Sequence, residues 1–277
     1  MVDTRIFTGW TFFIAICIAI YFGGWFLGVF IGLLLLFGMR ELLQMMHSKD
    51  LFPSVVTAYL GSITFVTLAC FNQSKYFHLV ATFLIISAFL AILRRGKEAR
   101  IKDIGATLIC VLYGGFLPSH FLFLRNMETG TFDVYGHHPS LALGYVILMV
   151  LCITVTDVAA YFAGKKFGKH KLWEEISPKK TVEGSIAGSL SAIFFAVITG
   201  AWLQMALWQS ITAGILITIF AQLGDLVESM MKRDAGAKDA SDILPGHGGF
   251  LDRADSYIFT VAIAYYFFYY FVEHPFF

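Results

Sequence analysis

Charged side chains are scarce in this sequence of 277 residues, since Asp, Glu, Lys and Arg together make up only 14%. A soluble domain normally carries about a quarter of its residues as charges. Hydrophobic residues account for 58% of the chain. The composition therefore argues against a soluble globular domain and favours a membrane protein.

A strong charge imbalance and a cysteine framework are also missing. The formal net charge is +1, which gives no reason to expect a nucleic-acid partner. Cys17, Cys70, Cys110 and Cys152 fall in apolar runs, without the spacing of paired or metal-ligating cysteines, and we expect them to be small packing residues. No internal repeat and no long Pro- or Ser-rich linker divides the chain, which predicts one integral membrane domain.

Long apolar runs are what the sequence has in abundance. A helix needs roughly 20 mainly apolar residues to cross a hydrocarbon core of ~30 Å. We therefore predict an all-α fold, a polytopic integral membrane protein with about nine transmembrane helices. The predicted spans lie near residues 6–22, 24–46, 52–71, 77–93, 103–124, 140–163, 185–206, 209–231 and 255–272. The first is expected to be retained, because it runs on too far for a signal peptide and lacks a small-residue cleavage site.

Positive charge is distributed on one side of this topology. Nine spans put the N-terminus and every second loop on the same face, and every Lys and Arg except Lys75 and Arg125 falls there. The positive-inside rule makes that face cytoplasmic. We expect a protein of the cytoplasmic (inner) membrane with its N-terminus in the cytoplasm and its C-terminus on the opposite side. One span more or fewer in the middle of the chain would distribute the Lys and Arg residues over both faces.

The two halves of the chain differ in their loops. Residues 1–124 hold five spans joined by short connectors, whereas residues 125–277 hold four spans and two charged cytoplasmic loops, 164–184 and 232–254. We therefore expect the chemistry in the second half, at the cytoplasmic ends of its helices.

Asp157 stands near the inner end of an otherwise apolar span. An ionised side chain is costly in a bilayer, so such a residue faces a cavity, a partner or an ion. Tyr161 and Gly164 follow at helical spacing and form a strip with Asp157 that is able to line a polar pocket. Helix packing by the tyrosine and glycine remains an equal alternative.

The segment from Ser177 to Gly184 combines lysines and hydroxyl groups at the start of the next span. Lys179 and Lys180 neutralise anionic oxygens, and the helix start offers free backbone N–H groups. The segment therefore predicts a phosphate cradle. A basic loop that only obeys topology would explain the lysines but not the whole string.

Carboxylates and basic residues are concentrated between Asp225 and Asp255. Asp225 and Glu228 share a helical face near the inner end of the eighth span. Carboxylates at a membrane surface suit Mg²⁺, while Lys and Arg hold the remaining phosphate charge. The glycines Gly246, Gly248 and Gly249 permit close approach of a ligand, although a plain turn explains them equally well.

These strings resemble the signature of the phosphatidate cytidylyltransferases, also called CDP-diacylglycerol synthases. The similarity covers the second half well and the first half only by hydropathy. Ala254, Val158 and Ala187 depart from the residues usual at their positions, which concerns packing rather than charge. The matching strings are Asp157-x-x-Ala160-Tyr161-x-x-Gly164, Ser177-Pro178-Lys179-Lys180-Thr181-x-Glu183-Gly184 and Ser229-x-Met231-Lys232-Arg233-(four residues)-Lys238-Asp239-x-Ser241-x-x-Leu244-Pro245-x-His247-Gly248-Gly249-Phe250-x-Asp252-Arg253-x-Asp255.

The resemblance implies that CTP and phosphatidate react to give CDP-diacylglycerol and pyrophosphate in phospholipid biosynthesis. It further implies a Mg²⁺ requirement, assistance by a monovalent cation such as K⁺, and a homodimer. We expect the metal at Asp225 and Asp252. The predicted catalytic residues are Asp225, Lys232, Arg233, Lys238, Asp239, Asp252, Arg253 and Asp255. The predicted substrate-binding residues are Asp157, Tyr161, Ser177, Lys179, Lys180, Thr181, Glu183, Ser229, His247, Gly248 and Gly249.

Within this set, several roles stay open. Lys179 and Lys180 hold either CTP or the lipid phosphate, while Lys232 and its basic neighbours neutralise the triphosphate. Asp239 and Asp255 either complete the metal shell or orient basic residues. His247 either touches phosphate or supports the loop.

Other classes of protein share part of this pattern. A CTP-dependent isoprenoid-alcohol kinase or a cytidylyltransferase for archaeal ether lipid would also bring nucleotide and lipid together. A cation-coupled transporter would use intramembrane carboxylates, but such sites lie near the bilayer midplane, often between inverted repeats. Here the carboxylates gather at one inner edge and no repeat is visible.

Overall fold

The computed structural model describes residues 11, 14–134, 136–241 and 248–274, most of which are helical. The chain forms two compact units. Unit 1 consists of Met1–Asn126 with Met231–Ala254, and unit 2 of Met127–Met230 with Asp255–Phe277. Residues 231–254 belong to unit 1 in this division, and the two-part organisation expected from the sequence, residues 1–124 and 125–277, stays a prediction.

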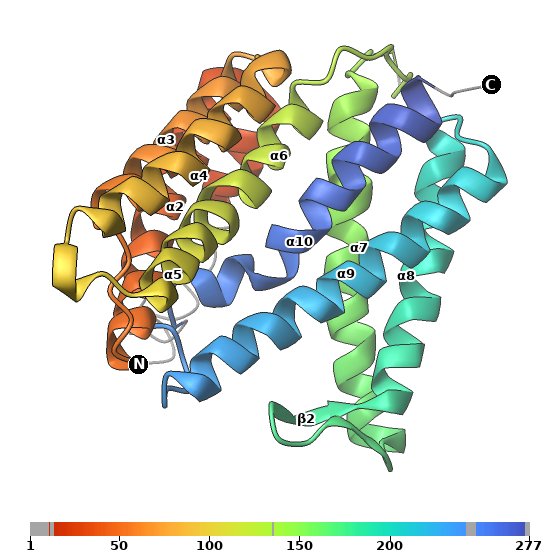
Figure 1. Cartoon of the computed structure of the whole chain (residues 1–277). Helices are drawn as coiled ribbons and strands as arrows, with labels where there is room; N and C mark the ends of the chain where they lie inside the picture. The colour runs from red at the N-terminus through yellow and green to blue at the C-terminus, as the bar shows by residue number, and fades with distance from the viewer. Residues whose placement is uncertain (1–10, 12–13, 135, 242–247, 275–277) are drawn as a thin grey trace. The chain divides into compact units, whose positions relative to one another are not determined.

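Besides the helical residues 14–22, the described part of the chain holds nine α-helices with defined bounds, short 3-10 and π-helical segments and one hairpin. The helices are α2 (Gly24–Ser48), α3 (Val55–Cys70), α4 (Phe77–Leu93), α5 (Ile101–Val111), α6 (Leu117–Arg125), α7 (Leu141–Phe167), α8 (Val182–Trp202), α9 (Leu207–Asp234) and α10 (Leu251–Phe267). The short segments are η1 (Ser74–Tyr76), η2 (Gly96–Glu98), η3 (Leu112–Phe116) and η4 (Phe268–Glu273), and the hairpin strands are β1 (Lys171–Trp173) and β2 (Ser177–Thr181). Figure 1 shows the order of these elements along the chain.

Every predicted span from 24–46 onward corresponds to helical structure, and α5, η3 and α6 together form the one expected at 103–124. Among the described residues, six helices are long and apolar enough to cross a membrane. The helix α3, with 16 residues, and α10, with 17 residues, are shorter. The all-α membrane architecture is therefore supported, but the predicted count of nine spans is not confirmed. The run 6–22 falls partly outside the described residues.

Gly23 and Gly24 lie at the point where the first two helical segments meet. Their φ angles are 63° and 52°, in the left-handed region that glycine adopts without steric cost. Arg125 stabilises the end of the first segment, because its guanidinium donates to the carbonyl oxygens of Ile20 and Tyr21, both at 2.7 Å. Arg125, one of the two basic residues predicted to lie on the face opposite the other positive charges, thus caps helix carbonyls.

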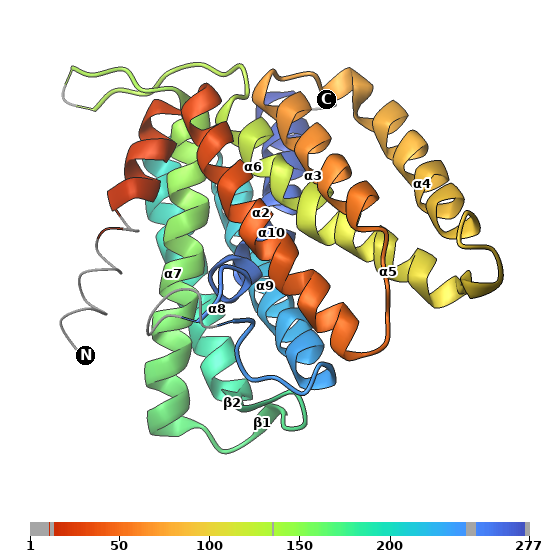
Figure 2. The ribbon, with the colours of Figure 1, turned by 90° about the vertical axis from the view of Figure 1, so that its left-hand side faces the viewer.

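In unit 1, α3 lies in the middle and contacts α2, α4, α5 and α6, while α4 lies at the edge (Figure 2). Aromatic rings fill the space between them, with Phe77 in contact with Phe65, Phe116 and Phe123. Many apolar side chains of α4 point outward, as expected for a helix that faces lipid.

In unit 2, α7 and α8 run side by side, and the hairpin connects them at one end (Figure 1). Small residues allow this close contact. A Cβ atom at Gly188 would lie 2.7 Å from the carbonyl oxygen of Thr156, and one at Gly184 would lie 2.7 Å from that of Ala160. Helices that pack through small residues gain van der Waals contact that lipid cannot replace.

The hairpin and the helix ends correct three sequence expectations. The strands β1 and β2 pair antiparallel, with Lys171 opposite Thr181, in a segment that the sequence predicted only as a loop. The helix α7 continues to Phe167 instead of 163, and α8 begins at Val182 instead of 185. The side chain of Thr181 accepts a hydrogen bond from the backbone N–H of Gly184 and so caps α8.

Candidate functional site

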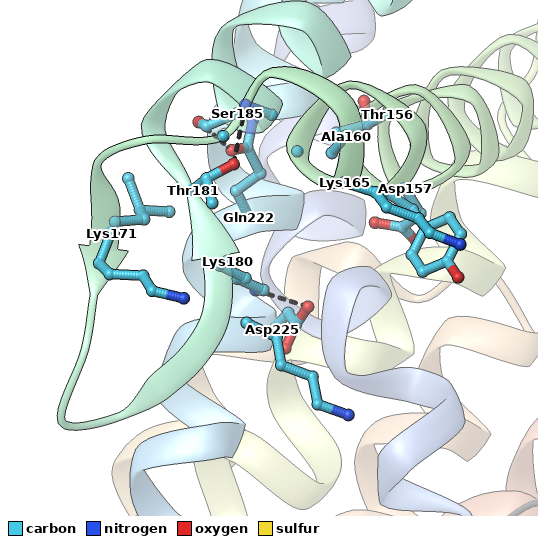
Figure 3. Close-up of a pocket in the computed structure, with 16 residues that line it drawn as sticks. Thr156, Asp157, Ala160, Lys165, Lys171, Lys180, Thr181, Ser185, Gln222 and Asp225 are labelled. Carbon is cyan, nitrogen blue, oxygen red and sulfur yellow. Dashed lines mark hydrogen bonds and ion pairs between the residues drawn. The ribbon is translucent and has the colours of Figure 1, made fainter.

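A cavity of about 450 Å³ opens in unit 2, between the last turns of α7, the hairpin, the first turn of α8 and α9. Figure 3 shows the residues around it. The strip of Asp157, Tyr161 and Gly164 on α7 lines one wall. Lys179, Lys180 and Thr181 come from the hairpin, and Asp225 comes from α9. Segments that are distant in the sequence are thus brought around one space.

Positive charge exceeds negative charge in the cavity wall. Four lysines, Lys165, Lys171, Lys179 and Lys180, face two aspartates, Asp157 and Asp225. The ammonium group of Lys180 lies 2.6 Å from a carboxylate oxygen of Asp225, a pair joined in Figure 3.

The remaining lysines are less engaged. Lys171 donates to the carbonyl oxygen of Pro178. The side chains of Lys165 and Lys179 form no hydrogen bond or ion pair with another described residue. A cavity with unmatched ammonium groups is suited to a polyanionic ligand such as a phosphate ester.

Glu183 fixes the entry to the hairpin rather than lining the cavity. Its carboxylate accepts hydrogen bonds from the backbone N–H groups of Lys169 and His170 and from the His170 ring, at 2.7 Å to Nδ1. These contacts tie the end of α7 to the start of α8. They thereby hold the strand that carries Lys179 and Lys180.

A polar network joins α7, α8 and α9 beside the cavity. Thr156 donates to Thr218 at 3.1 Å, and the Gln222 amide donates to Ser189 and Thr218, both at 3.1 Å. Ser185 donates to Gln222, an interaction also drawn in Figure 3. Asp225 follows Gln222 by one helical turn, so this network fixes the helix face that presents Asp225. The sequence interpretation missed these residues, although a glutamine within an apolar span was a usable signal.

A second cluster of predicted residues lies in unit 1, around Asp252 in the first turn of α10. Lys232 approaches Asp252 to 2.5 Å, and the two side chains are only 12% and 10% exposed. The other carboxylate oxygen accepts from the backbone N–H groups of Ala240, at 2.9 Å, and Gly249, at 2.7 Å. Burial raises the pKa of Asp252, but the hydrogen bonds from Lys232, Gly249 and Ala240 outweigh it and lower the pKa below its ordinary value.

The glycines of this cluster lie against carboxylates of the protein itself. Gly248 has a φ of 77°, and a Cβ atom there would lie 2.7 Å from Asp252 Oδ2. A Cβ atom at Gly249 would lie 2.6 Å from Oε1 of Glu41, a residue of α2 that the sequence interpretation did not single out. The absence of a side chain at Gly248 and Gly249 thus lets the backbone approach the carboxylates of Asp252 and Glu41.

The other predicted residues are more dispersed. Ser229 donates to Asp225 at 3.3 Å, and Arg233 donates to the carbonyl oxygen of Ala237 at 3.3 Å. Ser177 lies in β2 but does not line the cavity. The remaining predicted residues Lys238, Asp239 and Arg253 are exposed, Asp255 accepts from the backbone N–H of Ser256, and His247 falls outside the described residues.

The predicted Mg²⁺ site requires carboxylate ligands. Within the described ranges, no three His, Cys, Asp or Glu side chains gather as a complete metal cluster. Mg²⁺ usually takes one or two carboxylates together with substrate phosphates and water, so a cavity with two aspartates beside lysines fits such an ion. Asp225 belongs to unit 2 and Asp252 to unit 1, and their joint service as ligands stays a prediction.

Comparison with known proteins identifies the relatives of this chain. The family model described as "Cytidylyltransferase family" matches residues 3–271. A phosphatidate cytidylyltransferase of Synechocystis sp. is 39% identical, over 88% of this chain and 89% of its own length.

Relatives from other lineages agree. The phosphatidate cytidylyltransferase of Staphylococcus saprophyticus is 33% identical over 87% of this chain and 89% of its own length. The chloroplastic phosphatidate cytidylyltransferase 4 of Arabidopsis thaliana is 33% identical over 88% of this chain and 67% of its own length. In all three, the similarity spans both halves of this sequence.

Proposed function

This chain belongs to the cytidylyltransferase family, and we propose that it transfers the cytidylyl group of CTP to phosphatidate, giving CDP-diacylglycerol and pyrophosphate. The observation that carries the proposal is the cavity in unit 2, where four lysines and two aspartates surround about 450 Å³. Both substrates are phosphate esters, and both need cationic side chains at the membrane surface to bind.

The reaction requires little covalent help from the protein. A phosphate oxygen of phosphatidate attacks the α-phosphorus of CTP, and the bond from that phosphorus to the bridging oxygen of the leaving pyrophosphate breaks. The attacking oxygen is already anionic at neutral pH, so no general base has to remove a proton. The protein acts mainly by holding two anions together in line, which is positioning and charge neutralisation.

The lysines of the cavity perform that neutralisation. Lys165 and Lys179, without partners among the described residues, offer their charge to a bound phosphate. Lys180 is held toward the cavity by Asp225, and Lys171 stands on the neighbouring strand. Lys232, Arg233 and Lys238 remain proposed contacts of the triphosphate.

A divalent cation belongs to the proposal. Bound Mg²⁺ would neutralise phosphate oxygens, with Asp225 and Asp252 as its proposed ligands. A monovalent cation such as K⁺ and a homodimeric assembly are also proposed, on the strength of the family resemblance alone.

The proposed location is the cytoplasmic (inner) membrane. Six long apolar helices support insertion in a bilayer. The lysines of the hairpin and of the end of α7 support a cytoplasmic position for the cavity, because positive loops stay on that side. The C-terminus would then lie on the opposite side.

The decisive experiment uses the purified full chain with phosphatidate and CTP labelled at either the α- or the γ-phosphorus, with and without Mg²⁺. We expect lipid-linked label only from α-labelled CTP, one pyrophosphate released per lipid product, and no product after chelation of the metal. Label in the lipid from γ-labelled CTP, with CDP released, would identify a lipid kinase instead.

A further inference from the structure

Glu41 is a fully buried carboxylate in the first half of the chain, outside the strings that carried the family resemblance in the sequence. It stands on α2, where the neighbouring Met39, Leu42, Leu43 and Met45 are also buried. A carboxylate without partners in such surroundings would be strongly destabilising. The hydrogen-bond partners of the Glu41 carboxylate therefore indicate its structural role.

The partners of Glu41 come from the charged segment that follows α9. Its Oε1 accepts from the hydroxyl of Ser241 at 2.5 Å and from the backbone N–H of Phe250 at 3.0 Å. Its Oε2 accepts from the backbone N–H of Leu251 at 2.8 Å. Glu41 thus holds two points of the chain, Ser241 and the pair Phe250–Leu251.

The second of these points is the start of α10. The first N–H groups of a helix have no partner within it, and negative charge near them is stabilising. Most helices are capped by a side chain of the preceding turn. Here the cap comes from a different helix, so the first residue of α10 and the residue before it are tied to α2 within unit 1. The ring of Phe37, one turn before Glu41, stacks on Phe250 at 4.9 Å and reinforces the tie.

Asp252 is held by neighbours of the same residues. It accepts from the backbone N–H of Ala240, next to Ser241, and from that of Gly249, next to Phe250. Two carboxylates, Glu41 and Asp252, therefore accept hydrogen bonds from the same two stretches of the chain, residues 240–241 and 249–251. A shift of either stretch would move Asp252 and the Lys232 ammonium bonded to it.

We propose that Glu41 is a positioning residue, which fixes the Ser241 and Gly249–Leu251 backbone and thereby places Asp252 and Lys232 for the reaction. The expected effect on the reaction rests on the proposed function. The hydrogen bonds of Glu41 to Ser241, Phe250 and Leu251, which we call the Glu41 clamp, lie within unit 1. Glu41 touches no reacting atom and acts only through the backbone that it holds. A displacement of about 1 Å in a catalytic group is enough to lower turnover by up to about 100-fold.

The variant that tests the clamp is Glu41→Gln, which keeps the size of the side chain but replaces one acceptor oxygen by an NH₂ donor facing backbone N–H groups. We expect kcat to fall about 10- to 100-fold while the KM for phosphatidate stays within about twofold. Amide hydrogen exchange at Phe250 and Leu251 should accelerate. Glu98→Gln, the same change at an exposed carboxylate of unit 1, should alter neither kcat nor exchange.

Ser241→Ala is a milder second variant, because it removes one donor and leaves both backbone hydrogen bonds of Glu41. It should fold even if Glu41→Gln does not, and it should lower kcat less and leave the exchange of Leu251 slow. Unchanged kcat and exchange in Glu41→Gln would overturn the inference, as would faster exchange with normal kcat. If the wild-type chain makes no CDP-lipid, the proposed function fails, and exchange alone then decides whether Glu41 fixes the segment.

Discussion

The two clusters of charged residues differ in how far the protein satisfies them by itself. In unit 1, every oxygen of Asp252 has a hydrogen-bond donor, and its side chain is 10% exposed. In unit 2, the Asp225 side chain is 28% exposed, and the cavity beside it includes Lys165 and Lys179, whose ammonium groups form no ion pair within the described part of the chain. The first cluster is ordered by its own contacts, whereas the second is prepared for a ligand. Substitutions should therefore affect stability in the first cluster and ligand binding in the second.

The largest effects are expected from a matched pair, Asp225→Asn and Asp252→Asn. If both carboxylates serve the metal, each change removes several kcal/mol of transition-state stabilisation and lowers kcat/KM by about 1,000-fold or more. Wild-type rates in either variant would show that the residue is not a ligand. Product formation with CTP and phosphatidate is the measurement.

Stability should separate the same two variants. Asp252→Asn removes the carboxylate charge that lies 2.5 Å from the largely buried Lys232 ammonium, and breaking a buried ion pair costs about 3 kcal/mol or more. Asp225→Asn breaks a pair that solvent already screens and should cost much less. Thermal unfolding in detergent, followed by circular dichroism, tests the difference. An equal loss of Tm in both variants would remove the contrast between the clusters.

A smaller effect is expected when Lys165 is changed to Gln. Loss of one ammonium group that has no internal partner should raise the KM of an anionic substrate about 10- to 100-fold, because a hydrogen bond to a charged group contributes about 1.5–3 kcal/mol. The Tm should change little. Lys166→Gln is the control, since Lys166 lies over the ring of Phe167 and not in the cavity wall. Steady-state kinetics at two salt concentrations measures both. Equal KM values for Lys165→Gln and Lys166→Gln would show that Lys165 does not contribute to substrate binding.

The smallest effect is expected in the polar network between α7, α8 and α9. Thr218→Val keeps the shape of a fully buried side chain but removes its hydrogen bonds to Thr156, Ser189 and Gln222. Hydrogen bonds between membrane helices contribute on average about 0.6 kcal/mol, so we expect a small drop in Tm and a change in kcat below about threefold. Thr67→Val is the control, because the exposed Thr67 hydroxyl donates only to a carbonyl oxygen of its own helix, that of Ile63. A drop in Tm as large as that of Asp252→Asn would show that the network is the more important support.

The positions of the helices could be predicted well from hydropathy, but their ends could not. The predicted spans 140–163 and 209–231 end just before basic residues, whereas α7 continues through Lys165 and Lys166 and α9 continues through Lys232 and Arg233. A helix does not stop where the hydrocarbon stops, because its backbone hydrogen bonds continue in the interface and long basic side chains reach water. The hairpin was missed for a related reason, since short polar strands have no hydropathy signal.

The candidate site could be predicted in part. The sequence singled out Asp157, Tyr161, Lys179, Lys180 and Asp225, which the structure places around one cavity. It counted Lys165 and Lys171 only as topological charges, because nothing in a linear pattern says which lysines of a loop turn inward. It passed over Glu41, although a lone carboxylate near the inner end of an apolar span was the same signal that drew attention to Asp157.

The contact between α7 and α8 has a consequence for the route of a lipid. Gly184 and Gly188 bring the two backbones so close that even a methyl group would collide with the carbonyl oxygens of Ala160 and Thr156. An acyl chain is wider than a methyl group, so neither tail of a diacyl lipid can slide between these helices. The acyl chains of a bound lipid therefore have to remain outside the α7–α8 pair. The close contact of these two helices limits the side from which the lipid can reach the cavity.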